Sequence, residues 1–485
     1  MQYINGLWVD EGSHSFTSTN PATGAVLWQG KAADAAQVEA AVAAARAAFP
    51  GWAARSHEAR LAVLEAFKAL ISGAQEDLAT AIAEETGKAM WDAKSEAAAA
   101  VAKLTYTNEA YAERTGTKSR HSPVGNAVVR HKPHGVMAVY GPYNFPAHLP
   151  NGHIMPALLA GNTVVFKPSE QTPMVGEWMV KQWHKAGLPA GVLNLVQGER
   201  DTGIALSKAA VDGILFTGSS ATGRAIHAQF AGRPEIILAL EMGGNNPLIV
   251  SEISNLDAAV LETILSAFTG TGQRCTCARR LILPAWAGRD AFIESLLKTA
   301  ASLTIGAYNA TPAPFMGPVI SLREATRLLE AQNQLEKLGG KVLLRMRLLQ
   351  EGLPFVTPAI IDMTGVKNVP DEEYFGPLLQ LYQVDSPDEA AVIANQTRFG
   401  LSAAVLCDDY ALFQRLSSQL HAGLINWNRQ TTGASGAGPF GGVGVSGNHR
   451  PAGYYAADYC AYPVASVEVE GLALPTQLPP GLVIG

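Results

Sequence analysis

The sequence contains little cysteine, little charge and no long apolar run. Four cysteines among 485 residues are too few for a disulfide scaffold, so we expect a reducing compartment, the cytoplasm. No stretch approaches the roughly 20 apolar residues that cross a bilayer, and the first residues lack the pattern of a secretory signal. The net charge of −6 provides no basic surface. We therefore expect neither a nucleic acid nor a membrane as a partner.

Two of the cysteines, Cys275 and Cys277, stand close together, but no second cysteine or histidine pair follows at the spacing of a zinc site. We therefore predict no metal site. Hydrophobic residues make up 48% of the chain and charged residues 16%, which is typical of a well-packed globular protein. The length indicates two or three domains of about 150 to 200 residues each.

The first 134 residues predict helices followed by an extended arm. Asp34 caps a helix that Pro50-Gly51 closes, and Ser56 opens another. Helical patterning continues to about Arg114, and we interpret it as packing alone. Residues 115–134 alternate like a solvent-facing ribbon, which is only marginally stable without a partner surface. We expect this arm to reach another subunit.

From Gly135 onward, short apolar strands alternate with helices. The strands of the first half are predicted at 136–140, 163–166, 193–196, 213–216 and 236–240. The helices between them are predicted at about 147–160, 174–187, 201–209 and 220–231. This rhythm predicts an α/β fold with an open, doubly wound parallel sheet. A second alternating half follows from Pro247 to about Asn428, and a glycine-rich stretch at 433–447 is expected to pack near a site.

Ligands bind beyond the carboxyl ends of such strands, and the first and fifth strands are followed by polar residues that could do chemistry. Asn144 lies in a turn held rigid by one glycine and two prolines, where its amide could donate to a developing oxyanion. Its alternative role is that of an ordinary turn asparagine. Glu241 closes a strand and precedes two glycines. Partial burial would raise its pKa toward that of a general base, although a salt-bridged structural glutamate also fits.

The second and fourth strands are followed by residues suited to a dinucleotide. Lys167 and Glu170 could hold the hydroxyls of a ribose, and a carboxylate there would repel a 2′-phosphate, which favours NAD over NADP. Solvated loop charges are the alternative. The Gly218–Gly223 segment begins a helix whose free N–H groups could face pyrophosphate. It matches neither the G-x-G-x-x-G fingerprint nor a Walker A loop, so alone it is not specific.

Cys275 is the candidate nucleophile. It lies in a glycine-flanked turn between an apolar helical run and an apolar strand, where it could face a substrate. A thiol attacks only as the thiolate, and the positive charges of Arg274 and Arg279 are expected to favour ionisation. The alternative is that Cys275 and Cys277 are two small buried residues.

Together these residues supply a nucleophile, a base, an oxyanion donor and a dinucleotide cradle, and the chain resembles the NAD(P)-dependent aldehyde dehydrogenase superfamily. Leu240-Glu241-Met242-Gly243-Gly244 and Gly272-Gln273-Arg274-Cys275 match its two signature motifs. Further segments match in order over almost the whole chain: Gly141 to Pro146, Phe166 to Glu170, Phe216 to Gly223, Glu373 to Pro377 and Pro439 to Gly442.

The resemblance implies a role for each matching residue. Cys275 would be the nucleophile, Glu241 the general base and Asn144 an oxyanion donor. Residues at the cofactor would be Lys167, Glu170, Gly218, Ser219, Ser220, Ala221, Thr222, Gly223, Glu373 and Phe375. Cys277 falls two places after the motif cysteine, so it is not the nucleophile.

The family fold implies a Rossmann-like NAD domain, an α/β catalytic domain and a β-arm. The corresponding residues are 1–114 and 135–243 for the NAD domain, 244–447 for the catalytic domain, and 115–134 with 455–485 for the oligomerisation arm and tail. Members are usually dimers or tetramers, so we expect a homodimer or a dimer of dimers.

Within the superfamily, several segments resemble a member that oxidises an N-acylated amino-acid semialdehyde of arginine catabolism. Such a small anionic substrate needs cations and hydrogen-bond donors. The candidates from motif proximity are Arg274, His148, His153, Arg429, His449 and Arg450. Gly152 would leave room for a branched substrate, because many relatives carry a bulky aromatic residue near this place. Arg429-Gln430 departs from the Lys-Pro that the resembled enzyme tends to have, which affects substrate selection.

Three alternatives stay open. The chain could act on another semialdehyde, such as that of glutamate or succinate. It could transfer the thioester to coenzyme A, although such enzymes usually lack the base that Glu241 would be. It could also be a non-catalytic structural member, against which an intact set of Cys275, Glu241 and Asn144 argues.

Overall fold

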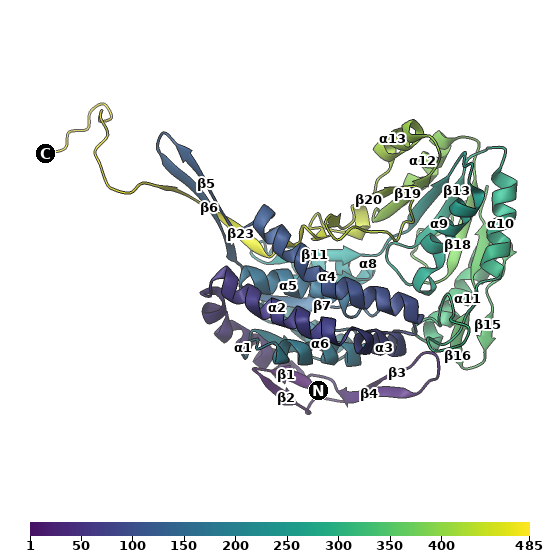
Figure 1. The fold of residues 1–485 in the computed structure, drawn as a ribbon, viewed down its shortest axis with the longest axis horizontal. Coiled ribbons are helices and arrows are strands. Elements are labelled where there is room, and N and C mark those ends of the chain that lie inside the picture. Colours follow the sequence, from purple (N-terminus) through teal and green to yellow (C-terminus); the bar gives the residue numbers. More distant parts are fainter.

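The computed structural model covers residues 1–485 and forms two α/β lobes, each around a seven-stranded sheet, with a narrow three-stranded arm (Figure 1). The first sheet has the order β11-β10-β7-β8-β9-β1-β2. Its strands are β1 (Gln2–Ile4), β2 (Leu7–Val9), β7 (Val136–Tyr140), β8 (Thr163–Lys167), β9 (Leu193–Leu195), β10 (Gly213–Gly218) and β11 (Ile237–Met242). β7 to β11 pair in parallel, so the predicted doubly wound sheet is confirmed.

Helices cover both faces of the first sheet, because successive strand side chains point to opposite sides. The helices of this lobe are α1 (Ala35–Ala53), α2 (His57–Gly73), α3 (Gln75–Thr86), α4 (Met90–Arg114), α5 (His148–Ala160), α6 (Pro173–Lys185), α7 (Arg200–Lys208) and α8 (Ser220–Gln229). Met137, Val139 and Val164 pack with α2 to α6 on one face. Val136 and Ala138 pack with α1, α7 and α8 on the other.

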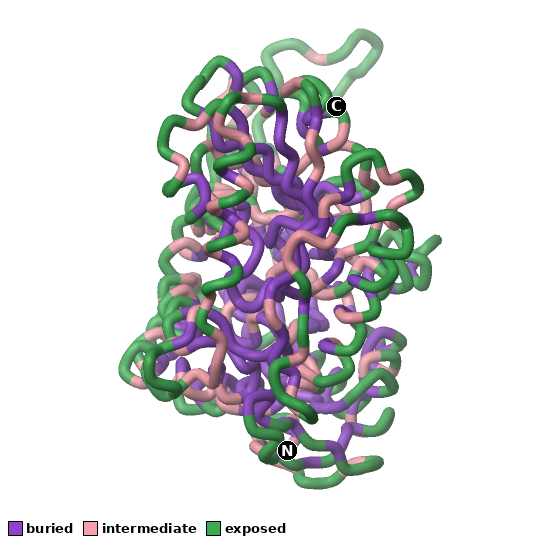
Figure 2. Tube along the Cα trace, turned by 90° about the vertical axis from the view of Figure 1, so that its right-hand side faces the viewer, coloured by how far each residue is buried: buried purple, intermediate pink, exposed green.

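The second sheet has the order β14-β17-β18-β13-β12-β19-β20. Its strands are β12 (Asn246–Val250), β13 (Ala278–Leu283), β14 (Lys341–Leu344), β17 (Ala359–Asp362), β18 (Leu378–Gln383), β19 (Ser402–Leu406) and β20 (Leu424–Trp427). Its helices are α9 (Leu256–Phe268), α10 (Arg289–Ala301), α11 (Leu322–Lys337), α12 (Pro387–Asn395) and α13 (Tyr410–Gln419). Buried residues lie inside the molecule and exposed residues at its surface (Figure 2), and the buried hydrophobic residues form separate clusters on the two faces of each sheet.

The arm consists of the hairpin β5 (Thr117–Ser122) and β6 (Gly125–Pro133), to which β23 (Ala461–Glu468) adds as a third antiparallel strand. It extends away from the lobes together with the C-terminal tail (Figure 1). The short remaining elements are β3 (Ser15–Thr19), β4 (Val26–Lys31), η1 (Thr269–Gly272), β15 (Leu348–Gln350), β16 (Leu353–Val356), β21 (Pro439–Phe440), η2 (Gly444–Ser446), β22 (Ala452–Gly453) and α14 (Ala456–Tyr459). No helix combines the length and apolar character needed to cross a membrane.

One predicted boundary is wrong: α1 does not close at Pro50-Gly51 but continues through both residues to Ala53. Proline within a helix loses one N–H bond, yet the last turn is held by Trp52. This indole is 1% exposed and donates to the Leu158 carbonyl at 3.0 Å. Tertiary packing therefore overrides the local stop signal.

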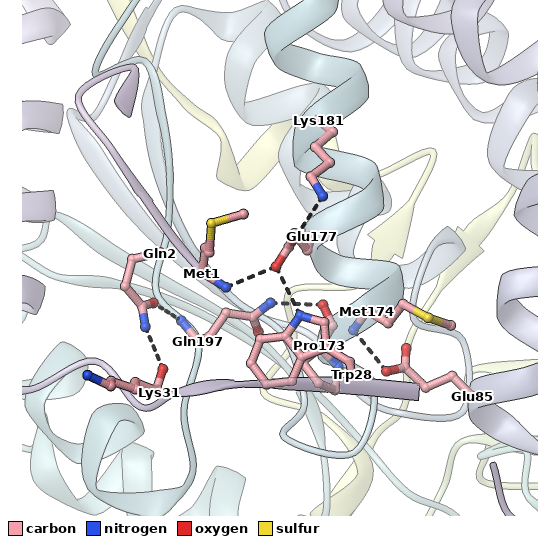
Figure 3. A network of polar contacts seen from close by, with 10 residues as sticks. All are labelled: Met1, Gln2, Trp28, Lys31, Glu85, Pro173, Met174, Glu177, Lys181 and Gln197. Carbon is pink, nitrogen blue, oxygen red and sulfur yellow. Dashed lines mark hydrogen bonds and ion pairs between the residues drawn. The ribbon is translucent and has the colours of Figure 1, made fainter. Parts of the chain in front are cut away.

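A buried polar network joins the N-terminal strands to α6 (Figure 3). The Glu85 carboxylate accepts from the N–H groups of Met174 and Val175, both at 2.8 Å. Glu177 accepts from the Trp28 indole and from the N-terminal amine of Met1, both at 2.9 Å. A carboxylate at a helix N-terminus satisfies otherwise free N–H groups, so Glu85 fixes the start of α6.

Candidate active site

The carboxyl ends of the parallel strands in the first sheet place the expected residues along one edge. Tyr140 at the end of β7 lies opposite Lys167 of β8 and Phe216 of β10. Thr217 of β10 lies opposite Glu241 of β11. Side chains that stand far apart in the sequence therefore share one edge, at which ligands of such sheets bind.

Cys275 lies in the connection between η1 and β13. This connection is tightly turned, since Gly270, Thr271 and Gly272 have φ values of 62°, 56° and 68°. At Gly272 a Cβ would also lie 2.2 Å from the Gly376 carbonyl oxygen, so only glycine fits.

Two buried side chains stabilise the turn that carries Cys275 by donating hydrogen bonds to its carbonyl groups. Asn246 donates to the carbonyls of Cys275 and Cys277 at 2.7 and 2.8 Å. Arg279, which is fully buried, donates to the carbonyls of Gly272, Arg274 and Gly376 at 2.7, 3.0 and 3.1 Å. The signature motif therefore supplies the thiol, and Asn246 and Arg279 fix the turn on which the thiol lies.

The electrostatic expectation for Cys275 holds for Arg279 but not for Arg274, and Arg279 does not decide the pKa. Burial raises the pKa of its thiol to about 12, and the carboxylates of Glu373 and Glu241 raise it further in the same direction. Arg279 acts to lower this pKa, but it does not outweigh those causes. Arg274 forms an ion pair with buried Asp92, so its charge is largely compensated. Arg279 therefore holds the turn and weakly favours the thiolate, whereas Arg274 is paired with Asp92.

Asn144 lies beside this turn and is 6% exposed. Its Nδ2 donates to the Gln273 carbonyl at 2.9 Å, which uses one of its two N–H bonds. The Cys275 backbone N–H makes no hydrogen bond within the chain. Two donors therefore remain free next to the thiol.

Glu241 is 4% exposed at the end of β11. Its Oε1 accepts from the Ala452 N–H at 3.2 Å, while its Oε2 is buried without a partner. Burial raises the pKa of this carboxyl well above its usual range. The glycine-rich segment comes close here, because a Cβ at Gly441 would lie 2.8 Å from Oε1. A general base must take up a proton readily and must have an oxygen free to receive it. The raised pKa of Glu241 and its unpartnered Oε2 meet these two requirements.

Glu373 reaches the same region from the second lobe. Its Oε1 accepts from the Gly244 N–H at 3.1 Å, and a Cβ at Gly243 would lie 1.8 Å from its Oε2. Burial raises the pKa of this carboxyl to about 7. Phe375 follows nearby, with its ring 6.0 Å from that of Tyr143. Gly243 and Gly244 therefore leave room beside Glu241 for a second carboxylate, that of Glu373, from the segment that precedes β18.

The expected dinucleotide residues lie at the edge of the first sheet. Lys167 is buried, with its Nζ 3.8 Å from Glu170, which is exposed. Ser219 caps α8 by accepting from the Thr222 N–H at 3.2 Å, and the N–H groups of Ser220 and Ala221 make no hydrogen bond. These free N–H groups and the buried cation suit an anionic ligand.

Gly218 and Gly223 serve packing. A Cβ at Gly218 would lie 2.5 Å from the Phe216 ring, and one at Gly223 would lie 2.3 Å from the Met242 sulfur. Alongside, a groove of about 790 Å³ runs between α8 and residues 444–449. His449 lines this groove, which does not include Cys275 or Asn144.

Of the six candidate substrate contacts, the structure brings only His148 and Arg274 together, both against Phe145. The His148 ring lies 6.2 Å from the Phe145 ring, and the Arg274 guanidinium lies 5.0 Å from it. Arg429 is exposed and 4.0 Å from Glu262. His449 and Arg450 are exposed.

The expectation for His153 is corrected. It is 1% exposed, and its two ring nitrogens contact the Tyr459 hydroxyl at 2.8 Å and the Thr217 hydroxyl at 3.1 Å. Both nitrogens are occupied inside the first lobe, so His153 has none to offer a substrate.

Sequence reasoning missed the charged face of α4, which it interpreted as packing. Asp92 and Glu96 are each 1% exposed, and Glu96 forms a 2.7 Å ion pair with buried Lys88. Lys103 lies two turns further along the same helix. The available signal was the helical spacing of these charges, which also fits a solvated face.

Comparisons with known proteins agree over nearly the whole chain. The profile of the aldehyde dehydrogenase family matches residues 8–463. Proteins of Burkholderia ambifaria and Chromobacterium violaceum, both named N-succinylglutamate 5-semialdehyde dehydrogenase, are each 55% identical over 99% of both chains. Among solved structures, PnpE in complex with nicotinamide adenine dinucleotide has a TM-score of 0.91 at 32% identity over 98% of both chains. A putative aldehyde dehydrogenase from Burkholderia cenocepacia has a TM-score of 0.90 at 32% identity, covering 98% of this chain and 99% of its own.

Proposed function

The chain belongs to the aldehyde dehydrogenase family, and we propose that it oxidises N-succinylglutamate 5-semialdehyde to N-succinylglutamate in arginine catabolism, with NAD as hydride acceptor. The names of the relatives at 55% identity support the substrate. The observation that carries the chemistry is the convergence of three residues from distant segments: Cys275 is half-buried, and Glu241 and Glu373 lie close enough to raise the pKa of its thiol.

The residues of the first lobe fit NAD. Lys167, buried and 3.8 Å from Glu170, would hold the adenosine ribose, and the free N–H groups at the start of α8 would face the pyrophosphate. Glu373 would hold the nicotinamide ribose, beside Phe375. The carboxylate of Glu170 would disfavour a 2′-phosphate. When bound, NAD would accept the hydride that leaves the reacting carbon.

The first half of the reaction forms a thioester on Cys275. The Cys275 thiol releases its proton to water, and the thiolate sulfur attacks the aldehyde carbon to form a tetrahedral adduct with an oxyanion. The free N–H of Cys275 and the Asn144 amide would donate to that oxygen. Loss of hydride from the former aldehyde carbon converts the adduct into a thioester. Covalent catalysis divides one difficult oxidation into two easier steps.

The second half hydrolyses the thioester. Glu241 has a raised pKa and a buried oxygen without a partner, so it can accept a proton from water as that water attacks the thioester carbonyl. The tetrahedral species then collapses and the carbon–sulfur bond breaks, which gives a carboxylic acid and the Cys275 thiolate. The proton of the acid passes to the sulfur, and Glu241 releases the other proton to solvent, so a carboxylate and the Cys275 thiol result. The substrate, which carries two carboxylates, thus becomes a product with three.

We assign a role to each part of the chain. The cofactor would bind to the domain formed by residues 1–114 and 135–243. The catalytic thiol belongs to residues 244–447, and subunits would be joined by residues 115–134 and 455–485. Support for the last assignment is the projecting arm, on which Val124, Tyr462 and Val467 are 72%, 43% and 62% exposed. Apolar side chains on a small sheet with open edges favour pairing with another chain. A homodimer or a dimer of dimers fits this surface.

Steady-state kinetics with a panel of aldehydes test the function. N-succinylglutamate 5-semialdehyde should give a higher kcat/KM with NAD than glutamate semialdehyde, succinate semialdehyde or simple aliphatic aldehydes. Cys275→Ala is the control and should abolish NADH formation with every aldehyde. A higher kcat/KM for another semialdehyde would contradict the proposed substrate, and activity in Cys275→Ala would contradict the mechanism.

A further inference from the structure

One face of α4 carries charged side chains, and most of them are turned toward the interior instead of toward solvent. Asp92 and Glu96 on this face are buried, Lys103 further along it is half-buried, and α4 packs against α5. Lys88 and Arg274 complete the cluster from neighbouring segments. Charged side chains are rarely buried unless they are paired, so each charge should have a partner.

Four of the five charges are paired. Arg274 pairs with Asp92, and Lys88 pairs with Glu96 at 2.7 Å. Glu96 is further satisfied by the N–H groups of Ala147 and His148 at 3.0 and 3.2 Å. The fifth charge, the Lys103 ammonium, has no carboxylate within ion-pair distance. Only burial acts on its pKa, lowering it to about 8.

A ring nitrogen near Lys103 also has no hydrogen-bond partner. The Nδ1 of His148 is buried and makes no hydrogen bond. Burial and then the charges of Lys103, Lys88 and Arg274 lower the pKa of His148 well below its usual value. His148 is therefore neutral and surrounded by cations. The cluster as a whole carries one uncompensated positive charge.

The space around Lys103 depends on Gly152, one turn after His148 on α5. A Cβ built at Gly152 would lie 3.7 Å from Lys103 Nζ and 3.8 Å from its Cε. Those are ordinary contact distances, so alanine fits, but any longer side chain would compete with the ammonium for its place. The absence of a side chain at Gly152 thus leaves room for the Lys103 ammonium group beside α5.

Phe145 links this space to the nucleophile. The Lys88 ammonium lies 3.7 Å above the Phe145 ring, the Arg274 guanidinium 5.0 Å from it and the His148 ring 6.2 Å from it. Arg274 directly precedes Cys275, and Asn144 directly precedes Phe145 and bonds to the Gln273 carbonyl. Lys103 adjoins this group through His148, because the Lys103 charge lowers the pKa of the His148 ring that packs against Phe145.

We propose that Lys103 binds a carboxylate of the substrate remote from its aldehyde group, and so selects carboxylated aldehydes over neutral ones. The inference rests on the proposed function, since it names the residue that recognises that substrate. A carboxylate placed against Lys103 would supply the missing counter-charge at a half-buried position, where an ion pair is stronger than in bulk water. His148 flanks the same space, but it contributes no positive charge.

The test is Lys103→Met, which removes the charge and keeps most of the side-chain volume, assayed with N-succinylglutamate 5-semialdehyde and with hexanal. We expect KM for the carboxylated aldehyde to rise roughly 10- to 100-fold, the range for a lost hydrogen bond to a charged group. KM for hexanal should change less than about threefold. Lys103→Arg should recover part of the loss, because it restores the charge.

Lys94→Met is the matched control, since Lys94 lies on the same helix in an exposed ion pair with Glu76; it should alter neither KM. Equal effects of Lys103→Met on both aldehydes, or no effect on the carboxylated one, would overturn the inference. Failure of the proposed function is separate. If the wild type prefers another carboxylated aldehyde, a selective loss for that aldehyde in Lys103→Met still supports the role of Lys103.

Discussion

The reactivity of Cys275 toward a small alkylating reagent should show a high thiol pKa in the protein without cofactor. With a pKa of about 12, about one thiol in ten thousand is ionised at pH 8, against roughly a quarter for an ordinary cysteine of pKa about 8.5. The thiolate fraction is thus lower by more than three orders of magnitude. A more basic thiolate is a better nucleophile, with a Brønsted slope of about 0.45, which recovers roughly 40-fold.

Alkylation by iodoacetamide, followed by mass spectrometry of the Cys275 peptide, measures this reactivity between pH 7 and 10. The rate should rise about tenfold per pH unit without a plateau, since the whole range lies below the thiol pKa. Cys277, Cys407 and Cys460 are buried, and Cys275→Ala removes the signal as the control. A plateau below pH 9 would refute the reasoning that burial and carboxylates dominate the thiol.

Glu373→Gln tests the electrostatic part. Glu373 has a pKa of about 7, so it is ionised above that pH and there disfavours a second negative charge on Cys275. Removing it should lower the thiol pKa by about one unit. The thiolate fraction then rises tenfold, nucleophilicity falls about threefold, and alkylation at pH 8 should be about three times faster. An unchanged or slower rate would show that Glu373 does not act on the sulfur.

Two further predictions concern the half-reactions and the space beside Lys103. Cys275→Ala should abolish the NADH burst, whereas Glu241→Gln should keep the burst and slow turnover, because only hydrolysis needs the base; equal loss of the burst in both would contradict the role of Glu241. Gly152→Trp should raise KM for N-succinylglutamate 5-semialdehyde more than for a short aldehyde, because the indole would displace Lys103. Gly152→Ala, whose Cβ fits, is the control, and equal effects of Trp on both aldehydes would remove the explanation.

The strand ends of the first sheet were predictable from the sequence because parallel strands carry their own signal. Each is a short apolar run closed by glycine or a polar residue, and β7 to β11 pair in register. Once the strands are parallel, their carboxyl ends lie along one edge, so the proximity of Lys167, Phe216 and Glu241 follows without coordinates. The family resemblance drawn from the same segments is confirmed over residues 8–463.

The electrostatics of Cys275 were not predictable, because they depend on which long-range neighbours reach the thiol. Arg274 and Arg279 both lie within four residues of Cys275 in the sequence, yet one pairs with Asp92 and the other donates to three carbonyls. Glu373 lies about a hundred residues away and has a larger effect on the thiol pKa than either. Local sequence therefore identifies the nucleophile, while its pKa is a property of the fold.

The charged face of α4 illustrates a different limit. Asp92, Glu96 and Lys103 have the spacing of a solvated helix face, and charge alone gives no indication of burial. The structure reverses the interpretation, because Asp92 and Glu96 are 1% exposed, so their charges must be balanced within the protein. Asp92 and Glu96 each have a cation, and Lys103 has no anion. A half-buried cation without a partner is partly desolvated at a cost in free energy, and a protein that acts on carboxylated molecules gains a function from that cost when the substrate supplies the anion.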